Sequence, residues 1–137
     1  NRGLMYLLDT DICSYFLRGR YRLQEKFEQV GPAALYVSRI TIAELLVLAH
    51  KNPESRINQE RIEELARTLV FVELDDPAWV MFSLTKARLQ RAGRPVGDFD
   101  ILQASIAMVR DLTLVTNNED HYRAMDIRVE NWVTGSR

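Results

Sequence analysis

Short apolar segments alternate with amphipathic segments along this chain, and this alternation constrains its fold more than any other feature. The apolar runs are typical of strands buried on both faces, as in parallel sheets, and the expected strands are residues 4–8, 35–40, 70–74, 112–115 and, more weakly, 127–129. Helices are expected between them at residues 11–19, 21–30, 41–50, 58–69, 76–92 and 98–110. Strands that alternate with helices favour a parallel sheet with helices on both faces.

Length and composition indicate one ordinary globular domain. The chain has 137 residues, of which 47% are hydrophobic, and no segment approaches the roughly 18 consecutive apolar residues of a membrane span. The single cysteine, Cys13, excludes a disulfide within the chain, so we expect a reducing cytoplasm and no membrane. No secretory signal is visible, and Met5 resembles a natural start. We therefore expect residues 1–4 to be a leader or an expression remnant and residues 5–137 to form one domain.

Charge limits what the chain can bind, because nucleic-acid-binding proteins are usually basic overall. This chain has a formal net charge of −1 and a pI of about 6.2. It can therefore bind nucleic acid only through a local patch, and a basic stretch that consists of Lys86, Arg88, Arg91 and Arg94 is the candidate. A solvated helix face is the other interpretation of that stretch.

Acidic residues follow the expected strands at places that a parallel sheet would bring together. Asp9 ends the first strand, Glu44 lies just inside the helix after the second, and Asp100 lies near the start of the last helix. In such sheets ligands bind beyond the carboxyl ends of the strands. Carboxylates crowd together only at a cost unless a cation neutralises them. Oxygen ligands without a histidine or cysteine set favour Mg²⁺ or Mn²⁺, and the pattern suggests phosphodiester hydrolysis.

Each acid also has a purely structural interpretation, and the residues alone leave both open. Histidine and cysteine offer no competing site, because His50 and His121 are isolated in the sequence and Cys13 is expected to fill space inside a helix. The structural roles are a backbone acceptor in the turn for Asp9, an N-cap for Asp11 and Asp98, a first-turn charge that suits the helix dipole for Asp100, and a capping box with Thr41 for Glu44.

Three ordered motifs resemble the PIN domain, and more closely the VapC-type ribonuclease toxins of bacterial toxin–antitoxin pairs. They are MYLLDTDICSYFLRG near the start, VSRITIAELL in the middle, and GRPVGDFDILQASIA followed by LTLVTNNEDHY near the end. A single D-T-D or A-E-L would carry little weight, but the ordered set spans most of the chain. The resemblance implies a three-layer α/β/α sandwich whose central, mainly parallel sheet has four to five strands.

The resemblance also implies a set of site residues. Asp9, Glu44 and Asp100 match the family acids that bind Mg²⁺ or Mn²⁺ and cleave RNA. Asp98, in the same GDFD motif, is left as a cap or auxiliary ligand. Thr116 and Asn118 are expected to orient ligands or water; Asn118 stands where many PIN domains carry a further acid, so a firmly held second metal is not expected.

Partners follow from the same resemblance. The family implies a VapB-like antitoxin that lies across the groove and covers the acids. It also implies a homodimer, for which Trp79, Val80 and Phe82 form one candidate surface. The other interpretation of these three apolar residues is that they belong to the core.

Other classes of protein fit the motifs less well. LLDTDIC nearly matches the nucleophile motif of haloacid-dehalogenase-type phosphatases, but in this chain GDFD precedes VTNN and no lysine follows Arg110. A phospho-receiver domain needs a lysine after its last strands, and Lys86 is the last lysine here. A catalytically silent PIN fold that serves as a binding scaffold is the main alternative to a ribonuclease.

Overall fold

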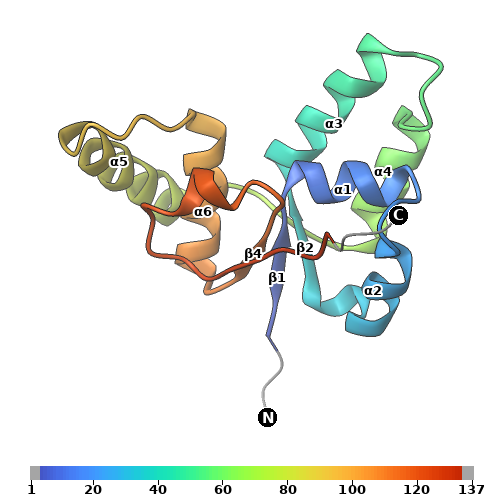
Figure 1. The fold of residues 1–137 in the computed structure, drawn as a ribbon, viewed down its shortest axis with the longest axis horizontal. Coiled ribbons are helices and arrows are strands. Elements are labelled where there is room, and N and C mark those ends of the chain that lie inside the picture. Colours follow the sequence, from blue (N-terminus) through green and yellow to red (C-terminus); the bar gives the residue numbers. More distant parts are fainter. Residues whose placement is uncertain (1–3, 134–137) are drawn as a thin grey trace.

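A central sheet of five parallel strands organises the protein in the computed structural model, which describes residues 4–133 (Figure 1). Of the expected leader at residues 1–4, all but Leu4 lie outside the described part. The strands stand in the order β3-β2-β1-β4-β5, and every neighbouring pair is parallel. They are β1 (Tyr6–Leu8), β2 (Leu35–Ser38), β3 (Val70–Val72), β4 (Thr113–Val115) and β5 (Val129–Glu130).

Helices connect successive strands, as parallel pairing requires. They are α1 (Thr10–Leu17), α2 (Leu23–Val30), α3 (Arg39–Lys51), α4 (Gln59–Thr68), α5 (Asp76–Arg91) and α6 (Asp98–Arg110), with short 3₁₀ turns η1 (Pro32–Ala34) and η2 (Glu119–Tyr122). The expected elements are confirmed, and their ends differ from the expected ones by at most two residues. None of the helices between residues 4 and 133 is long and apolar enough to cross a bilayer.

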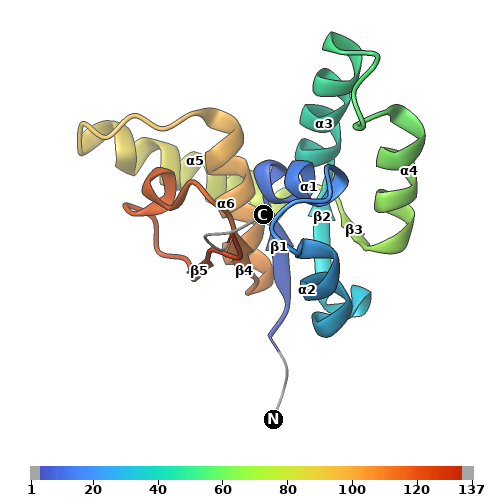
Figure 2. The ribbon, with the colours of Figure 1, turned by 45° about the vertical axis from the view of Figure 1, so that its right-hand side comes forward.

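Two helical layers cover the sheet, which confirms the α/β/α sandwich. Figures 1 and 2 show α5 and α6 on one side of the strands and α1 to α4 on the other. Each layer has its own buried core. Leu8, Ile12 and Leu45 belong to the core on the α1–α4 side, whereas Leu7 and Ile101 belong to the core under α5 and α6. Adjacent residues of β1 thus face opposite layers, as strand geometry dictates.

The strand order places a topological switch point beside β1. From β1 the chain adds β2 and then β3 on one side, and β4 and then β5 on the other. The loops that leave β1 and β4 therefore diverge at their carboxyl ends, which is where ligands bind in open α/β sheets. Asp9 directly follows β1, and Thr116 directly follows β4. These two residues mark the edge that carries the site.

Helix N-caps differ from the expected ones because several polar residues compete at each start. The local backbone selects the residue in extended conformation directly before the first helical turn. The observed caps are Asp9 rather than Asp11 for α1, Ser38 rather than Thr41 for α3, and Gly97 rather than Asp98 for α6.

Leu114 provides a test of the core beneath the carboxyl edge of the sheet. It lies fully buried in β4, between β1 and β5. We expect Leu114→Ala to lower the free energy of unfolding by about 2–5 kcal/mol, because it leaves a cavity in the core. Chemical denaturation monitored by circular dichroism measures this change.

Val47→Ala is the control, because Val47 is 55% exposed on α3. It should change the free energy of unfolding by less than about 0.5 kcal/mol. Equal effects of the two substitutions would contradict the described packing.

Candidate active site

The predicted acids meet at an open cavity on the carboxyl edge of the sheet. The cavity has a volume of about 620 Å³, and its lining includes Asp9, Asp11, Glu44 and Asp100. These residues come from the end of β1, from α1, from α3 and from the start of α6. Helices of both layers therefore contribute carboxylates to a single space.

Asp9 is the most enclosed of these acids, with 6% of its surface exposed. Its Oδ1 accepts hydrogen bonds from the Thr10 backbone N–H (2.9 Å) and from Gln103 Nε2 (3.2 Å). Its Oδ2 accepts from the Thr116 hydroxyl (2.9 Å) and the Tyr122 hydroxyl (3.0 Å). A buried carboxylate is tolerated only when such donors satisfy it. The turn interpretation of Asp9 accounts for one of these four contacts, the Thr10 N–H.

Glu44 does not form the expected capping box. The N-cap of α3 is Ser38, whose hydroxyl accepts from the Thr41 N–H. The Glu44 carboxylate instead accepts a hydrogen bond from the Thr10 hydroxyl at the start of α1. Burial raises the pKa of the Glu44 carboxyl, the Thr10 bond lowers it, and the charges of Asp9 and Asp100 raise it further. Glu44 is therefore coupled electrostatically to the acids of two other elements.

Asp100 faces the cavity, and its neighbour Asp98 does not. Asp100 Oδ1 accepts from the Tyr122 hydroxyl (3.2 Å), and its Oδ2 lies 2.7 Å from His121 Nδ1. Asp98 is exposed, lies outside the cavity lining, and forms an ion pair with Lys86 (2.9 Å). Of the two acids in the GDFD motif, Asp100 is therefore the one that lies at the cavity.

Asp11 lies closer to the site than its expected role as a helix cap suggested. Its Oδ2 accepts from the Asn117 backbone N–H at 2.9 Å, and so it joins the start of α1 to the loop after β4. Burial, and after it the negative charge of Asp9, raises the pKa of the Asp11 carboxyl to about 6. Asp11 is therefore a fourth acid of the cavity.

Thr116 and Asn118 both lie at the site, as the sequence suggested. The Thr116 side chain is fully buried, and its oxygen accepts from the Asn118 backbone N–H (3.0 Å) while its proton points to Asp9. This chain of contacts holds the loop after β4 against β1. Asn118 is exposed and lines the cavity. Their suggested part in orienting ligands or water stays a prediction.

The donor set of the cavity fits a hard divalent cation by its chemistry. Apart from the imidazole of His121, the potential ligands that line the cavity are carboxylate, amide and hydroxyl oxygens, which Mg²⁺ and Mn²⁺ prefer. Within residues 4–133, however, no three His, Cys, Asp or Glu side chains stand close enough together to share an ion. Glu44 and Asp100 are turned instead toward Thr10 and His121. Both would have to exchange these partners for a shared ion.

The predicted basic stretch does not border the acids. Lys86 is paired with Asp98, and Arg88 donates to the Ala124 carbonyl oxygen at 3.1 Å. Arg18, the C-cap of α1, lines the cavity, whereas Lys86, Arg88, Arg91 and Arg94 do not. A part of these four residues in binding RNA stays a prediction.

Sequence reasoning missed three residues of this site. Tyr122 bridges Asp9 and Asp100 with its hydroxyl, and burial, followed by these two charges, raises its pKa above the ordinary tyrosine value. His121, interpreted as isolated, contacts Asp100. Gln103 contacts Asp9 from α6. The VTNNEDHY and DILQAS segments contain these residues, but no local pattern marks them. By contrast, Cys13 is buried as predicted.

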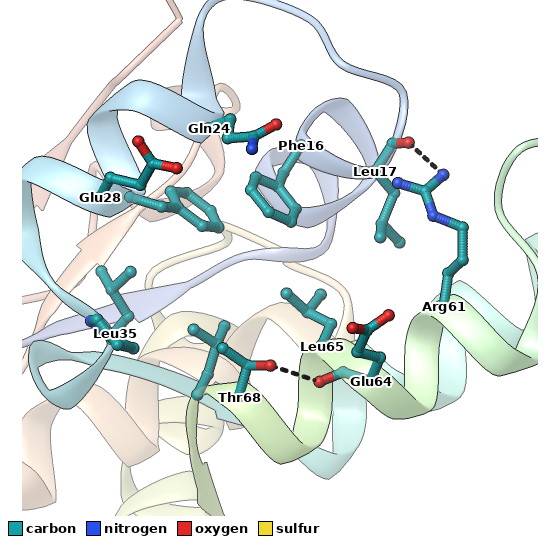
Figure 3. A pocket seen from close by; sticks show the side chains of 12 residues that line it. Phe16, Leu17, Gln24, Glu28, Leu35, Arg61, Glu64, Leu65 and Thr68 are labelled. Carbon is teal, nitrogen blue, oxygen red and sulfur yellow. Dashed lines mark hydrogen bonds between the residues drawn. The ribbon is translucent and has the colours of Figure 1, made fainter.

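A second cavity, of about 380 Å³, lies between α1, α2 and α4 (Figure 3). Its wall includes the stacked rings of Phe16 and Phe27, whose centroids are 4.3 Å apart, together with Leu65 of α4. Glu28 and Glu64 stand among its polar lining residues. Helix α1 lines both cavities: Ser14, Tyr15 and Arg18 face the acids, and Phe16 and Leu17 face this groove.

Comparison with known proteins agrees with the geometry. The family model "PIN domain" matches residues 6–126. A tRNA(fMet)-specific endonuclease VapC from Shigella flexneri is 31% identical over 94% of this chain and 98% of its own length. Ribonuclease VapC2 from Haemophilus influenzae is 33% identical, with 95% and 99% covered. A chain in the crystal structure of DNA-bound VapBC from Salmonella typhimurium superposes with a TM-score of 0.85 at 30% identity, with 95% and 99% covered.

The chain therefore belongs to the PIN domain family and, within it, to the VapC ribonucleases. The resemblance drawn from the three motifs is confirmed. The five-stranded parallel sheet and its two helical layers are the fold that the resemblance implied.

The shared electrostatics of the acids can be tested without any metal. We expect Asp100→Asn to lower the pKa of Glu44 toward the ordinary glutamate value, because it removes one of the negative charges that raise it. Carboxyl ¹³C chemical shifts of labelled glutamate, followed as a function of pH, report this pKa.

Asp98→Asn is the matched control, since it removes an equal charge two residues away, outside the cavity. It should leave the Glu44 titration unchanged. If both variants, or neither of them, moved the titration, the described grouping of the acids would be wrong.

Proposed function

We propose that this protein is a Mg²⁺- or Mn²⁺-dependent endoribonuclease and the toxin of a VapBC-type toxin–antitoxin pair. The observation that carries the proposal is the convergence of Asp9, Glu44 and Asp100 from three elements on one cavity at the switch point of the sheet. Binding a cation would give a physical reason for gathering this much negative charge in one cavity. Membership of the VapC ribonucleases supplies the reaction class.

The residues divide into those that would hold the cation and those that orient them. Asp9, Glu44 and Asp100 would hold it through carboxylate oxygens. Bound there, it would acidify a water molecule and stabilise charge on the scissile phosphate. Thr116 and Tyr122 fix the direction of the Asp9 carboxylate through their hydroxyls. Because these hydroxyls are neutral, they leave its charge available.

Transfer RNA is the substrate class that we propose. The relative from Shigella flexneri is named a tRNA(fMet)-specific endonuclease, and it aligns with nearly all of this chain. In RNA, single-stranded loops are the parts that proteins read most readily. Arg18, beside the acids, and the stretch from Lys86 to Arg94 would bind the phosphate backbone and make binding sensitive to salt.

We place the antitoxin on the groove between α1, α2 and α4. The solved neighbour from Salmonella typhimurium is a VapBC complex. Here the groove offers aromatic and aliphatic side chains, with Glu28 and Glu64 among its polar residues. Those features fit an amphipathic helix with basic flanks. Such a helix would lie on α1, whose other side lines the acid cavity, so its extension could cover Asp9 and Glu44.

A homodimer and a cytoplasmic location complete the proposal. On α5, Trp79 is 47% exposed and Val80 is 58% exposed. They are therefore surface residues rather than core residues, whereas Phe82 is partly buried and packs against the core. The exposed pair, with the ring of Phe82 edge-on to Trp79, would form the apolar centre of a subunit interface.

A reducing cytoplasm suits the unpaired thiol of Cys13.

RNA cleavage tests the catalytic part of the proposal. Purified wild-type protein should cut initiator tRNA when Mg²⁺ or Mn²⁺ is present and should stop when the ion is chelated. Asp100→Asn should lower the rate by about 100-fold or more, because it removes a carboxylate that would hold the cation. Electrostatic stabilisation of the transition state typically contributes a factor of this size. Gel electrophoresis of end-labelled tRNA measures the rate.

Asp98→Asn keeps the cavity intact and should cleave like the wild type. A folded wild-type protein that cleaves no RNA with either ion would favour the silent PIN scaffold instead. Turnover of a small phosphomonoester would favour the phosphatase.

Charge reversal in the groove tests the antitoxin part. We expect the double variant Glu28→Lys, Glu64→Lys to bind the antitoxin at least about 10-fold more weakly. The two new lysines would repel the basic flanks of the proposed helix, which the two glutamates would attract. The probe is the small DNA-binding protein encoded beside the toxin gene, and titration calorimetry measures its affinity.

Both substituted residues are exposed and lie away from the acids. RNA cleavage should therefore persist. Glu63→Lys, which reverses one charge on α4 next to Glu64 but outside the groove lining, serves as the control. Unchanged affinity of the double variant would move the antitoxin to another surface.

A further inference from the structure

A glutamine amide lies buried in the core beside the acids. Gln103 is 1% exposed and follows Asp100 by three residues on α6, so that both lie on the same face of the helix. Its neighbours Leu102 and Ala104 belong to the buried apolar core. A polar side chain in such a place costs free energy unless all its hydrogen bonds are made. A leucine would fill the position without that cost.

Every polar group of this amide has a partner. Its Oε1 accepts from the Ser38 hydroxyl at 2.5 Å. Its Nε2 donates to Thr41 Oγ1 at 3.0 Å and to Asp9 Oδ1 at 3.2 Å. Since the ionised Asp9 can only accept, the NH₂ group must face it and Oε1 must face Ser38. The amide is therefore locked in one orientation.

This network joins the elements that carry the acids. Asp9 ends β1, Ser38 and Thr41 start α3, one turn before Glu44, and Gln103 lies on α6 with Asp100. The Thr41 hydroxyl also lies 3.4 Å from the Leu8 carbonyl oxygen. One side chain from the α5–α6 layer thus contacts the sheet and the other helical layer at the base of the cavity.

We propose that Gln103 is a positioning residue for the metal site: its amide fixes the Asp9 carboxylate and the spacing of α3 and α6, so that Asp9, Glu44 and Asp100 can share one ion once Glu44 and Asp100 turn from Thr10 and His121. The inference rests on the proposed function. Partners behind metal ligands contribute typically about 10–100-fold to metal affinity. Gln103 would act through Asp9 and through the placement of α3, and would touch neither the ion nor the RNA.

Manganese binding to the folded, full-length protein tests this proposal. Gln103→Met keeps the length of the side chain and removes its hydrogen bonds. We expect the Kd for Mn²⁺, measured by titration calorimetry, to rise by about 10-fold or more. Ser105→Ala is the matched control, because Ser105 is buried on the same helix and bonds only the Ile101 carbonyl of that helix. Whatever its effect on stability, it should leave the Kd unchanged.

Ser38→Ala separates positioning from general loss of stability. If the Ser38 hydroxyl acts through the amide, Ser38→Ala should raise the Kd in the wild-type background and add nothing in Gln103→Met. Wild-type affinity in a folded Gln103→Met would overturn the inference. Should that variant fail to fold, an unchanged Kd in Ser38→Ala would overturn it instead. Absence of Mn²⁺ binding by the wild type would refute the proposed function itself.

Discussion

One buried charge, the carboxylate of Asp9, explains why so many parts of this protein meet where they do. Removing an ion from water costs several kcal/mol, so the fold must supply polar partners. The four donors are the Thr10 N–H, the Gln103 amide and the hydroxyls of Thr116 and Tyr122. They come from α1, α6, the loop after β4 and η2. Satisfying Asp9 therefore fixes the relative positions of both helical layers and the sheet.

The other acids depend on this arrangement. Tyr122 reaches from Asp9 to Asp100, and Thr10, which follows Asp9, holds Glu44. Each carboxylate is thus linked to Asp9 through a neutral donor rather than through a basic side chain, apart from the contact of His121 with Asp100. Neutral donors satisfy the oxygens while they leave the negative charge in place. This is the electrostatic state that a cation-binding site requires.

Helix α1 borders both the acid cavity and the groove between α1, α2 and α4. Its first residues hold Asp9 and Asp11 at the cavity, and Phe16 and Leu17, near its other end, line the separate groove. A partner bound in that groove would rest on the helix that presents the acids. Occupying the groove and covering the acids are therefore geometrically compatible for one extended partner.

The sequence was sufficient for the sheet, its helices and the principal acids, because each follows a local pattern. Apolar runs mark β1 and β4, and the position of an acid after a strand marks Asp9. It was insufficient where neighbours compete: the residues favour Asp11 and Thr41 at the starts of α1 and α3, whereas Asp9 and Ser38 are the caps, and Glu44 forms no capping box. Gln103 and Tyr122 left no local signal, since they contact Asp9 across 94 and 113 residues of chain.

Anomalous diffraction from crystals soaked in Mn²⁺ tests the central claim most directly. The account predicts one anomalous peak in the acid cavity, with oxygens of Asp9, Glu44 and Asp100 at coordination distance, about 2.0–2.2 Å. That result requires Glu44 and Asp100 to turn from Thr10 and His121 toward the ion. A well-ordered cavity without a peak, or a manganese ion bound by other residues, would contradict the account.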